Sequence, residues 1–323
     1  MRPLKFHPIL KQTLWGGERI IPYKELASGL SRVGESWELS GMPGSESVVA
    51  EGPWAGSTLS ELIGRFGAEL LGKANYARFG QEFPLLVKFI DAREDLSIQV
   101  HPDDELARKR HGKSGKCEMW YVLEAEPGAS LLTGFSRPIA PAEYERRVAD
   151  NTLTDVLNRQ AIASGDVFYL PAGRVHSIGK GSFIVEIQQS SDITYRIYDF
   201  DRRDAAGNSR ELHTELAREA IDFESSENSR ITYAPENNQE VRLVTTPYCT
   251  TSLYNQTART RCDWSATDSF EAIVLLQGSG SLTDNEGNRI DVRQGETWLL
   301  PASTQWTEIT PHTAPLRLLT SRI

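Results

Sequence analysis

The sequence predicts a mainly β protein built from two jelly rolls, or double-stranded β-helices, with a few decorating helices. Most apolar segments are short, rich in β-branched and aromatic residues and bounded by Gly, Pro, Asn or Asp, as in residues 166–171 (DVFYLP) and 183–188 (FIVEIQ). The phrase GDVFYLPA at residues 165–172 returns as GETWLLPA at residues 295–302. A repeated turn, strand and proline at one spacing indicates two related β units, and this strand-turn-strand pattern is typical of a jelly roll.

Further strands follow the same repeat. The apolar run CEMWYVL at residues 117–123 precedes the first phrase, and FEAIVLLQG at residues 270–278 precedes the second. Both runs end in turn residues. The two units are therefore expected to share their strand order.

Helical spacing of apolar residues occurs in three stretches. We expect helical segments at about residues 58–83, 141–157 and 211–223, with Pro141 suited to a first turn. A shorter helix is expected over residues 103–110, where acidic residues come first and basic residues last, in agreement with the helix dipole.

These elements predict two domains. We expect a catalytic domain over residues 1–225 and a smaller one over residues 226–323, with the acidic, Asn- and Ser-rich stretch 224–240 as an exposed linker. A chain of 323 residues is long enough for two such units.

Composition excludes several functional classes. The formal net charge of −9 and the pI near 5.3 argue against a nucleic-acid or anionic-membrane partner. Cys117, Cys249 and Cys262 are odd in number and widely spaced, which favours a reducing compartment, by default the cytoplasm. No stretch has the apolar length of a signal peptide or a membrane span.

Four residues form a candidate metal site. His101 lies near the end of the alternating segment 96–102 (LSIQVHP), which also places Gln99 on the same face. Glu118 lies on the next apolar strand, and His176 follows a Pro-Ala-Gly turn. Two imidazoles, a carboxylate and an amide oxygen suit zinc with an open position, although manganese, iron or cobalt also accept such a set.

A histidine taken alone is more often a hydrogen-bonded core or surface residue than a ligand. The coincidence of the four residues is harder to explain in that way, because a carboxylate on an apolar strand is costly to bury without a partner. A shared cation would resolve this cost for Glu118 and the histidines together.

The chain resembles the type I mannose-6-phosphate isomerases of the cupin superfamily, in their short bacterial form. The strongest matches are the central motif and the lysine-x-glutamate strand, and weaker ones run through the first two-thirds of the chain. The matching segments are residues 96–103 (LSIQVHPD), 115–121 (GKCEMWY), 14–17 (LWGG), 34–38 (GESWE), 171–176 (PAGRVH) and 190–196 (SSDITYR). This resemblance implies two cupin-type jelly rolls and one zinc ion per chain held by Gln99, His101, Glu118 and His176.

The chain also departs from the long members of that family. Only about 57 residues separate Glu118 from His176, with one modest helix between them. Cys117 stands where the long forms usually have proline, and Gly115 replaces a histidine often found before their lysine. Trp306 takes the place of His176 in the second unit, so we expect no metal there.

The resemblance implies an interconversion of mannose 6-phosphate and fructose 6-phosphate through a cis-enediol. It points to Lys88, Ser97 and Trp15 for substrate binding. Lys88 interrupts an apolar strand, where a lysine either reaches solvent or serves a site.

It also points to Lys116 and Arg196 as catalytic residues. Arg196 is followed by Asp199 and Asp201, so a surface ion-pair network is the alternative interpretation for it.

Proton transfer between C1 and C2 needs a group with a tuned pKa. The candidates are Lys116, Glu186 and Asp192, and the sequence does not choose between them.

Three alternatives to this function remain open. A cupin oxygenase would use a similar metal set with iron but would not require Lys88, Lys116 and Arg196 together. A non-catalytic sugar-binding protein could keep the fold, and an isomerase could act on another phosphorylated sugar. A sugar phosphate is the expected partner, with the chain as a monomer or a homodimer.

Overall fold

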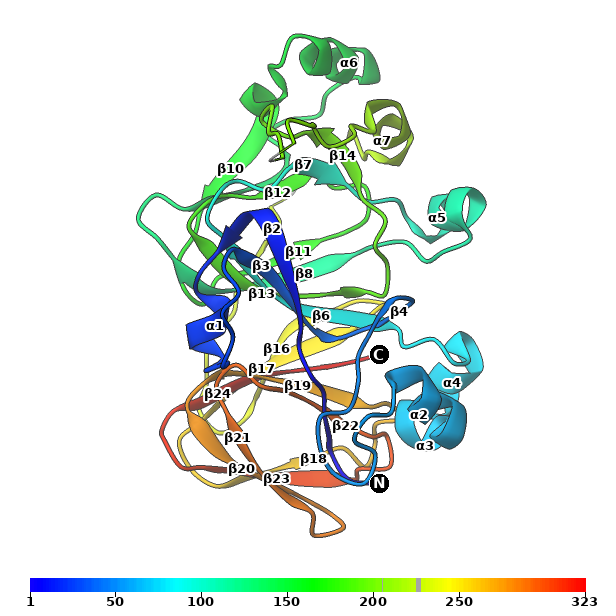
Figure 1. The fold of residues 1–323 in the computed structure, drawn as a ribbon, viewed down its shortest axis with the longest axis vertical. Coiled ribbons are helices and arrows are strands. Elements are labelled where there is room, and N and C mark those ends of the chain that lie inside the picture. The colour runs from blue at the N-terminus through cyan, green and yellow to red at the C-terminus, as the bar shows by residue number, and fades with distance from the viewer. Residues whose placement is uncertain (205, 225–227) are drawn as a thin grey trace.

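The computed structural model describes residues 1–204, 206–224 and 228–323. It is mainly β, as predicted, and its strands gather into two stacked barrels (Figure 1). In Figure 1 the strands of the first barrel are mainly green and cyan, with β2 and β3 in blue, and those of the second barrel are mainly yellow, orange and red.

Two sheets face each other in the first barrel. Within the described residues the larger sheet has the strand order β15-β11-β8-β13-β6-β2-β3 and the smaller one β10-β9-β12-β7-β14. The bounds in the larger sheet are β15 Arg230–Ile231, β11 Val167–Leu170, β8 Glu118–Ala125, β13 Ser182–Gln189, β6 Leu85–Ala92, β2 Ile9–Gly17 and β3 Val33–Leu39; those in the smaller sheet are β10 Leu157–Ala161, β9 Ser130–Phe135, β12 His176–Ile178, β7 Ile98–Val100 and β14 Tyr195–Tyr198.

The second barrel repeats this plan. Its described strands form one sheet of order β1-β22-β19-β24-β17-β16 and another of order β18-β23-β20-β21. The bounds are β1 Leu4–Lys5, β22 Thr297–Leu300, β19 Glu271–Gln277, β24 Leu316–Arg322, β17 Thr250–Gln256 and β16 Glu240–Thr245, then β18 Thr260–Asp263, β23 Trp306–Pro311, β20 Ser279–Asp284 and β21 Arg289–Arg293; β4 Gly41–Met42 and β5 Ser45–Glu46 form a separate hairpin. The repeated phrases become β11 and β22, which confirms the internal repeat.

Side chains alternate between the two faces of each strand, so the strands of the larger sheet contribute to two separate hydrophobic clusters. On β6, Val87 and Phe89 belong to a cluster that also contains Val274 and Leu319 of the second barrel, so this face packs barrel against barrel. Ile90 belongs to the cluster inside the first barrel. Because successive side chains in a strand point to opposite faces, the central strands of the larger sheet are buried on both sides.

The helices lie outside the barrels. Helices α2 to α4 flank the second barrel in Figure 1, and α5 to α7 cover the smaller sheet of the first barrel, with Ala107 and Ala217 in a cluster shared with β7 and β14. Their bounds are α1 Ile20–Tyr23, α2 Leu59–Phe66, α3 Ala68–Leu71, α4 Lys73–Phe79, α5 Asp104–His111, α6 Pro141–Ala149, the 3-10 turn η1 Leu153–Val156 and α7 Thr214–Ala220.

The expected helix over residues 58–83 is divided into three. Gly67 and Gly72 have φ angles of 51° and 94°, and a residue with positive φ ends an α-helix. At Gly72 a Cβ would lie 2.1 Å from the carbonyl oxygen of Asp268, so the chain turns there against the second barrel. The segment 141–157 likewise ends its helix at Ala149, and only Thr214–Ala220 of residues 211–223 is helical.

The boundary expected between residues 225 and 226 lies outside the described residues, as does part of the expected linker. Two short strands cross that division in sequence. β1 pairs with β22 of the second barrel, and β15 pairs with β11 of the first. One short strand from each predicted domain therefore pairs with the barrel of the other domain. The domain limits stay a prediction.

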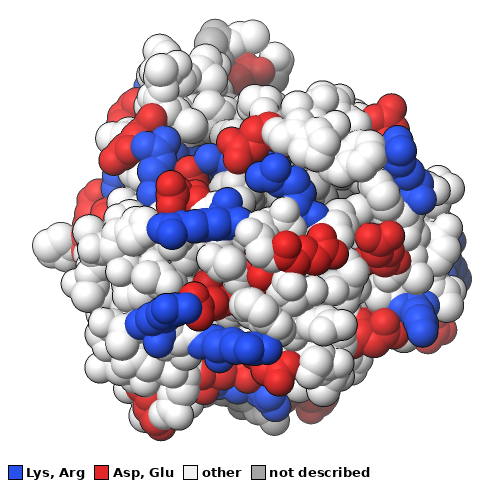
Figure 2. Space-filling model, turned by 90° about the horizontal axis from the view of Figure 1, so that it is seen from below, with Lys and Arg blue, Asp and Glu red and all other residues white. Residues whose placement is uncertain are grey.

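The surface carries both signs of charge. On the face in Figure 2, which looks from the end of the second barrel, basic and acidic side chains are interspersed. Among the described residues, no helix has both the length and the apolarity of a membrane span.

Candidate metal centre and active site

Strand alternation brings three distant residues together inside the first barrel. Glu118 opens β8 and His176 opens β12, while His101 follows directly after β7. All three are at most 2% exposed. Their candidate ligand atoms lie within 4.8 Å of one another, which makes them a possible metal site.

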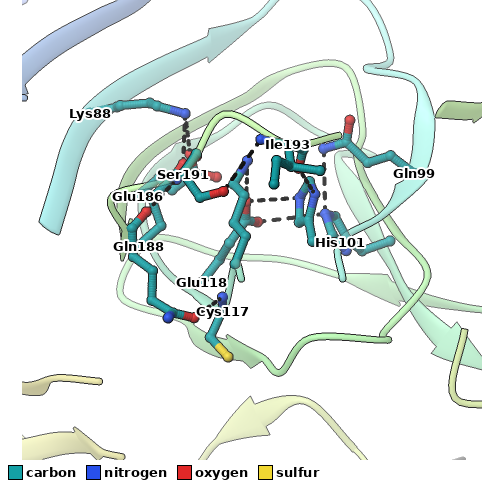
Figure 3. Close-up of polar contacts among 12 residues, drawn as sticks. Lys88, Gln99, His101, Cys117, Glu118, Glu186, Gln188, Ser191 and Ile193 are labelled. Atoms are coloured by element: carbon teal, nitrogen blue, oxygen red, sulfur yellow. Dashed lines mark hydrogen bonds and ion pairs between the residues drawn. The ribbon is translucent and has the colours of Figure 1, made fainter. Parts of the chain in front are cut away.

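The carboxylate of Glu118 lies between the two imidazoles. His101 Nε2 is 3.1 Å from Glu118 Oε1, and His176 Nε2 is 3.5 Å from Glu118 Oε2. Figure 3 shows Glu118 directed toward His101, with Gln99 on the far side of the imidazole.

Backbone carbonyls fix the tautomer of both histidines. His101 Nδ1 lies 2.8 Å from the carbonyl oxygen of Ile193, and His176 Nδ1 lies 2.7 Å from that of Arg174. A carbonyl oxygen only accepts, so each Nδ1 carries the hydrogen and each Nε2 presents a lone pair.

Those lone pairs face the negative carboxylate of Glu118. His101 Nε2 and Glu118 Oε2 are buried without a hydrogen-bond partner among the described residues, while Glu118 Oε1 forms an ion pair with Lys116 Nζ at 2.9 Å. Buried acceptors that face one another are unfavourable unless a cation joins them. The donor set and its orientation therefore fit a divalent metal ion.

The pKa shifts favour the unprotonated ligand set. Burial lowers the pKa of His101 to about 3 and also lowers the pKa of His176. Burial alone would raise the pKa of Glu118, but the Lys116 ammonium and His101 outweigh it and hold that pKa well below the ordinary value. Neutral imidazoles and an ionised carboxylate are the forms that bind a metal.

Gln99 lies at the edge of this group. Its Nε2 is 3.4 Å from His176 Nε2, and its Oε1 accepts a hydrogen bond of 3.3 Å from Ser97 Oγ. A ligand role would require the amide oxygen in the position that the nitrogen now has. Direct ligation by Gln99 stays a prediction.

A cavity of about 650 Å³ opens beside these residues, a size typical of small-molecule sites. One wall of the cavity is formed by residues 12–15 of β2 and residues 32–37 at and before β3, and the opposite wall by residues 194–196 at β14. Its lining includes every predicted catalytic and substrate-binding residue together with Gln99: Trp15, Lys88, Ser97, Gln99, Lys116, Glu186, Asp192 and Arg196.

Two buried lysines form the inner end of the cavity. Lys88 Nζ donates to Glu186 Oε1 at 2.8 Å and to Gln188 Oε1 at 2.8 Å (Figure 3). Lys116 Nζ is 2.9 Å from Glu118 Oε1, so it links the cavity to the metal site. Both ammonium groups are paired with a buried carboxylate.

Glu186 has the environment of a group that can exchange protons. Trp120 Nε1 donates to its Oε2 at 2.9 Å. Burial and the neighbouring Glu118 raise the pKa of Glu186 against the opposing effect of Lys88. Burial lowers the pKa of Lys88, but Glu186 and Glu35 outweigh it, so the pKa of Lys88 is raised overall.

Asp192 and Arg196 lie farther out. The side chain of Asp192 is 49% exposed and pairs with Lys113 at 2.9 Å. Arg196 Nη1 donates to the carbonyl oxygen of Glu211 at 2.9 Å, while its Nε is buried without a hydrogen-bond partner among the described residues. Burial and the nearby Arg210 lower the pKa of Arg196.

The expected ion-pair network forms around Asp199 instead. Arg210 Nε and Nη2 reach the two Asp199 oxygens at 2.8 Å and 2.5 Å, and Arg202 Nη1 is 3.8 Å away. Within the described part of the chain, Arg196 forms no ion pair with Asp199 or Asp201. The surface-network interpretation of Arg196 therefore does not describe its contacts.

Some lining residues were not singled out from the sequence. Arg32, Glu35, Trp37 and Arg210 all line the cavity. Glu35 and Trp37 alternate along the segment 34–38, and that alternation was the available signal for one shared face. Arg32 and Arg210 carry no such pattern, because they lie in loops.

The chain is similar to known proteins in both sequence and fold. Residues 4–132 match the family model for the catalytic domain of phosphomannose isomerase type I. The chain is 34% identical over 304 residues to mannose-6-phosphate isomerase ManA of Bacillus subtilis, covering 93% of each chain. It is 33% identical over 302 residues to the mannose-6-phosphate isomerase of Streptococcus mutans, covering 93% of this chain and 92% of that one.

The whole fold is also shared with a solved structure. The crystal structure of the mannose 6-phosphate isomerase from Bacillus subtilis aligns with a TM-score of 0.90 and 29% sequence identity, covering 100% of both chains. Both barrels therefore have counterparts in one solved relative.

Proposed function

As a member of the type I phosphomannose isomerase family, the chain is a mannose-6-phosphate isomerase, and we propose that it works with one divalent cation held by His101, Glu118 and His176. The observation that carries this proposal is the pair of Nε2 lone pairs that face the Glu118 carboxylate, whose Oε2 has no hydrogen-bond partner among the described residues. Gln99 supplies a fourth ligand in this proposal, next to His176.

We propose zinc as that cation. The set of two imidazoles, a carboxylate and an amide suits zinc with a position left for substrate. When bound, the cation acts as a Lewis acid that polarises the sugar oxygens at C1 and C2.

The substrate is mannose 6-phosphate or fructose 6-phosphate, and the two interconvert through a cis-enediol. Interconversion moves one proton between C1 and C2 and another between the two oxygens. In this proposal the reacting carbons of the hexose phosphate lie at the inner end of the cavity, beside the lining residues Gln99 and Lys116.

Glu186 is the proton carrier that its environment supports best. Its pKa is raised by burial and by Glu118, so it holds a proton more readily than an ordinary glutamate does. Lys88 and the Trp120 indole orient its carboxylate.

The other predicted residues act around this centre. Lys116 donates toward the sugar oxygens while it contacts Glu118. Ser97 and Trp15 shape and orient the bound sugar, and Arg196 supplies positive charge on the β14 wall. Asp192, exposed and paired with Lys113, is the weaker candidate for proton transfer.

A coupled assay on mannose 6-phosphate tests the proposal. Activity should disappear after chelation and return when zinc is added. His101→Ala should lose both activity and bound metal, whereas a matched change at the exposed His312→Ala should lose neither. Activity that persists in chelator and in His101→Ala would overturn the proposed metal mechanism.

A further inference from the structure

The wall of the cavity formed by β2 and β3 contains an irregular segment. Gln12 and Gly17 both pair with Val33, so residues 13–16 bulge out of the ladder. Thr13, Leu14 and Trp15 of this bulge line the cavity, and so does Arg32, which precedes β3. The bulge and the arginine therefore form one side of the cavity together.

The backbone of Arg32 is held in place by several contacts. Its N–H donates to Glu18 Oε1 at 3.0 Å, and its carbonyl oxygen accepts from the Thr13 N–H at 3.1 Å. Its φ angle is 53°, a left-handed conformation that few non-glycine residues adopt without compensating contacts.

Two glycines allow this close packing. A Cβ at Gly16 would lie 2.3 Å from the carbonyl oxygen of Arg32, and a Cβ at Gly34 would lie 2.1 Å from Thr13 Oγ1. A side chain at Gly16 would clash with the backbone, and one at Gly34 would require Thr13 and Trp15 to move. The glycines at positions 16 and 34, in the segments LWGG (residues 14–17) and GES (residues 34–36), therefore allow the close backbone packing around Arg32.

The charged group of Arg32 differs from the other cations of the cavity. Lys88 and Lys116 pair with buried carboxylates, and Arg210 forms two hydrogen bonds with Asp199. The Arg32 guanidinium has no ion pair or hydrogen bond among the described residues, although its main chain is well bonded.

The remaining arginine of the lining belongs to the opposite wall. Arg196 pairs in register with Gln99, which places it beside the candidate metal ligands. Arg32 is exposed at the cavity mouth, on the wall formed by β2 and β3. A substrate whose C1 and C2 lie at the inner end directs its C6 substituent toward the mouth.

We propose that Arg32 is the residue that binds the phosphate of the substrate and thereby selects phosphorylated over free sugars. This inference rests on the proposed function, because it takes the orientation of the sugar from the candidate metal site. A guanidinium with all its donors available suits a phosphate, which it can bind through two parallel hydrogen bonds. The backbone contacts fix the point on the cavity wall from which the Arg32 side chain extends.

Steady-state kinetics test this role. Arg32→Gln should raise the KM for mannose 6-phosphate roughly tenfold to a hundredfold, with kcat changed by about twofold at most. Arg32→Lys should recover part of the affinity, since it restores the charge without the bidentate geometry. The matched surface variant Arg242→Gln, whose side chain is 60% exposed, should behave as the unmodified protein.

A binding measurement makes the test independent of turnover. Inorganic phosphate should raise the melting temperature of the protein and of Arg242→Gln, and should raise that of Arg32→Gln much less. A phosphate shift unchanged in Arg32→Gln would overturn the inference, and so would an unchanged KM. The inference also fails if Arg196→Gln raises KM and Arg32→Gln does not, because the phosphate would then bind on the β14 wall.

The outcomes also separate this inference from the proposed function. A protein without isomerase activity on mannose 6-phosphate contradicts the proposed function, whatever the variants do. Normal isomerase activity with an unaffected Arg32→Gln contradicts only the role of Arg32.

Discussion

His176 lies directly opposite Gln99 in the antiparallel pairing of β12 with β7, although 77 positions separate them in the chain. The pairing places the Gln99 amide 3.4 Å from His176 Nε2. We expect Gln99→Ala to weaken metal binding by roughly tenfold to a hundredfold, because ligands and their immediate partners contribute at this scale.

Titration of the metal-depleted protein with zinc measures this effect. Gln305→Ala, at an exposed position, is the matched control and should bind zinc unchanged. Equal zinc affinity in Gln99→Ala and the control would remove Gln99 from the candidate metal site.

The candidate proton carriers Glu186 and Asp192 differ in burial, and we expect their variants to differ accordingly. Glu186→Gln should lower kcat by roughly 10² to 10⁴, the usual contribution of a general acid or base. Asp192→Asn should change kcat by only about a fewfold, because its carboxylate is 49% exposed and paired with Lys113.

Metal content and thermal unfolding of each variant must be measured together with kcat, because Glu186 is also the ion-pair partner of Lys88 and its replacement can alter stability. Lys116→Met should lower kcat as well, but its loss of the contact with Glu118 should also change metal affinity. A larger kcat loss in Asp192→Asn than in Glu186→Gln would reverse the proposed assignment.

A buried ion pair of the first barrel, Lys24 with Glu38, also contacts the second barrel through the carbonyl oxygen of Gly295. Lys24 Nζ donates to Glu38 Oε2 at 2.8 Å and to the carbonyl oxygen of Gly295, and Ser36 Oγ donates to Glu38 Oε1 at 2.5 Å. Lys24→Met should lower the free energy of unfolding by about 3 to 5 kcal/mol, because it leaves the Glu38 carboxylate buried without its cation.

Urea unfolding of the single variants and of the double variant Lys24→Met/Glu38→Gln measures the coupling. The double variant should be more stable than Lys24→Met, because the uncompensated charge is gone. If the effects of the two single substitutions simply add, Lys24 and Glu38 do not stabilise the fold as a pair.

Glu271 gives the second barrel a pH-dependent stability. Burial raises the pKa of Glu271 to about 7 against the opposing effect of Arg322, whose Nη1 donates to its Oε1 at 3.0 Å. An unfolded glutamate has a pKa near 4.5. The folded state therefore holds more protons between these values, and stability falls as pH rises from about 4.5 to about 7.

Glu271→Gln should remove this contribution. Unfolding measured at about pH 5, 6, 7 and 8 should show the unmodified protein losing stability relative to the variant as pH rises, by about 1.4 kcal/mol per pH unit at most. A constant difference between the two proteins across this range would contradict the shift.

Much of the fold could be predicted because its signals are local. Turn residues, apolar runs and the repeated phrase that became β11 and β22 depend only on neighbouring residues. The prediction of one helical segment over residues 58–83 was less accurate. Its division at Gly72 depends on the approach of Asp268, a contact with the distant second barrel that local spacing does not contain.

The site residues were predictable as residue types but not as partners. The sequence indicated that Lys88, Glu118 and Glu186 interrupt apolar strands. It did not indicate that Lys88 pairs with Glu186 or that Trp120 orients the same carboxylate. Arg32 lay outside the prediction entirely, because its position depends on a bulge closed by Gly16 and Gly34.

By itself, the sequence determined the period-two alternation that places Gln99 and His101 on one face of a strand. It also supplied Glu118, on an apolar strand, and His176, after a Pro-Ala-Gly turn, as further candidate ligands. Only the tertiary structure decided that those faces turn inward to one point, since antiparallel pairing between remote strands sets which residues lie opposite each other. It also decided which charges are neutralised and which remain available, because ion pairs form between side chains that the chain order keeps far apart.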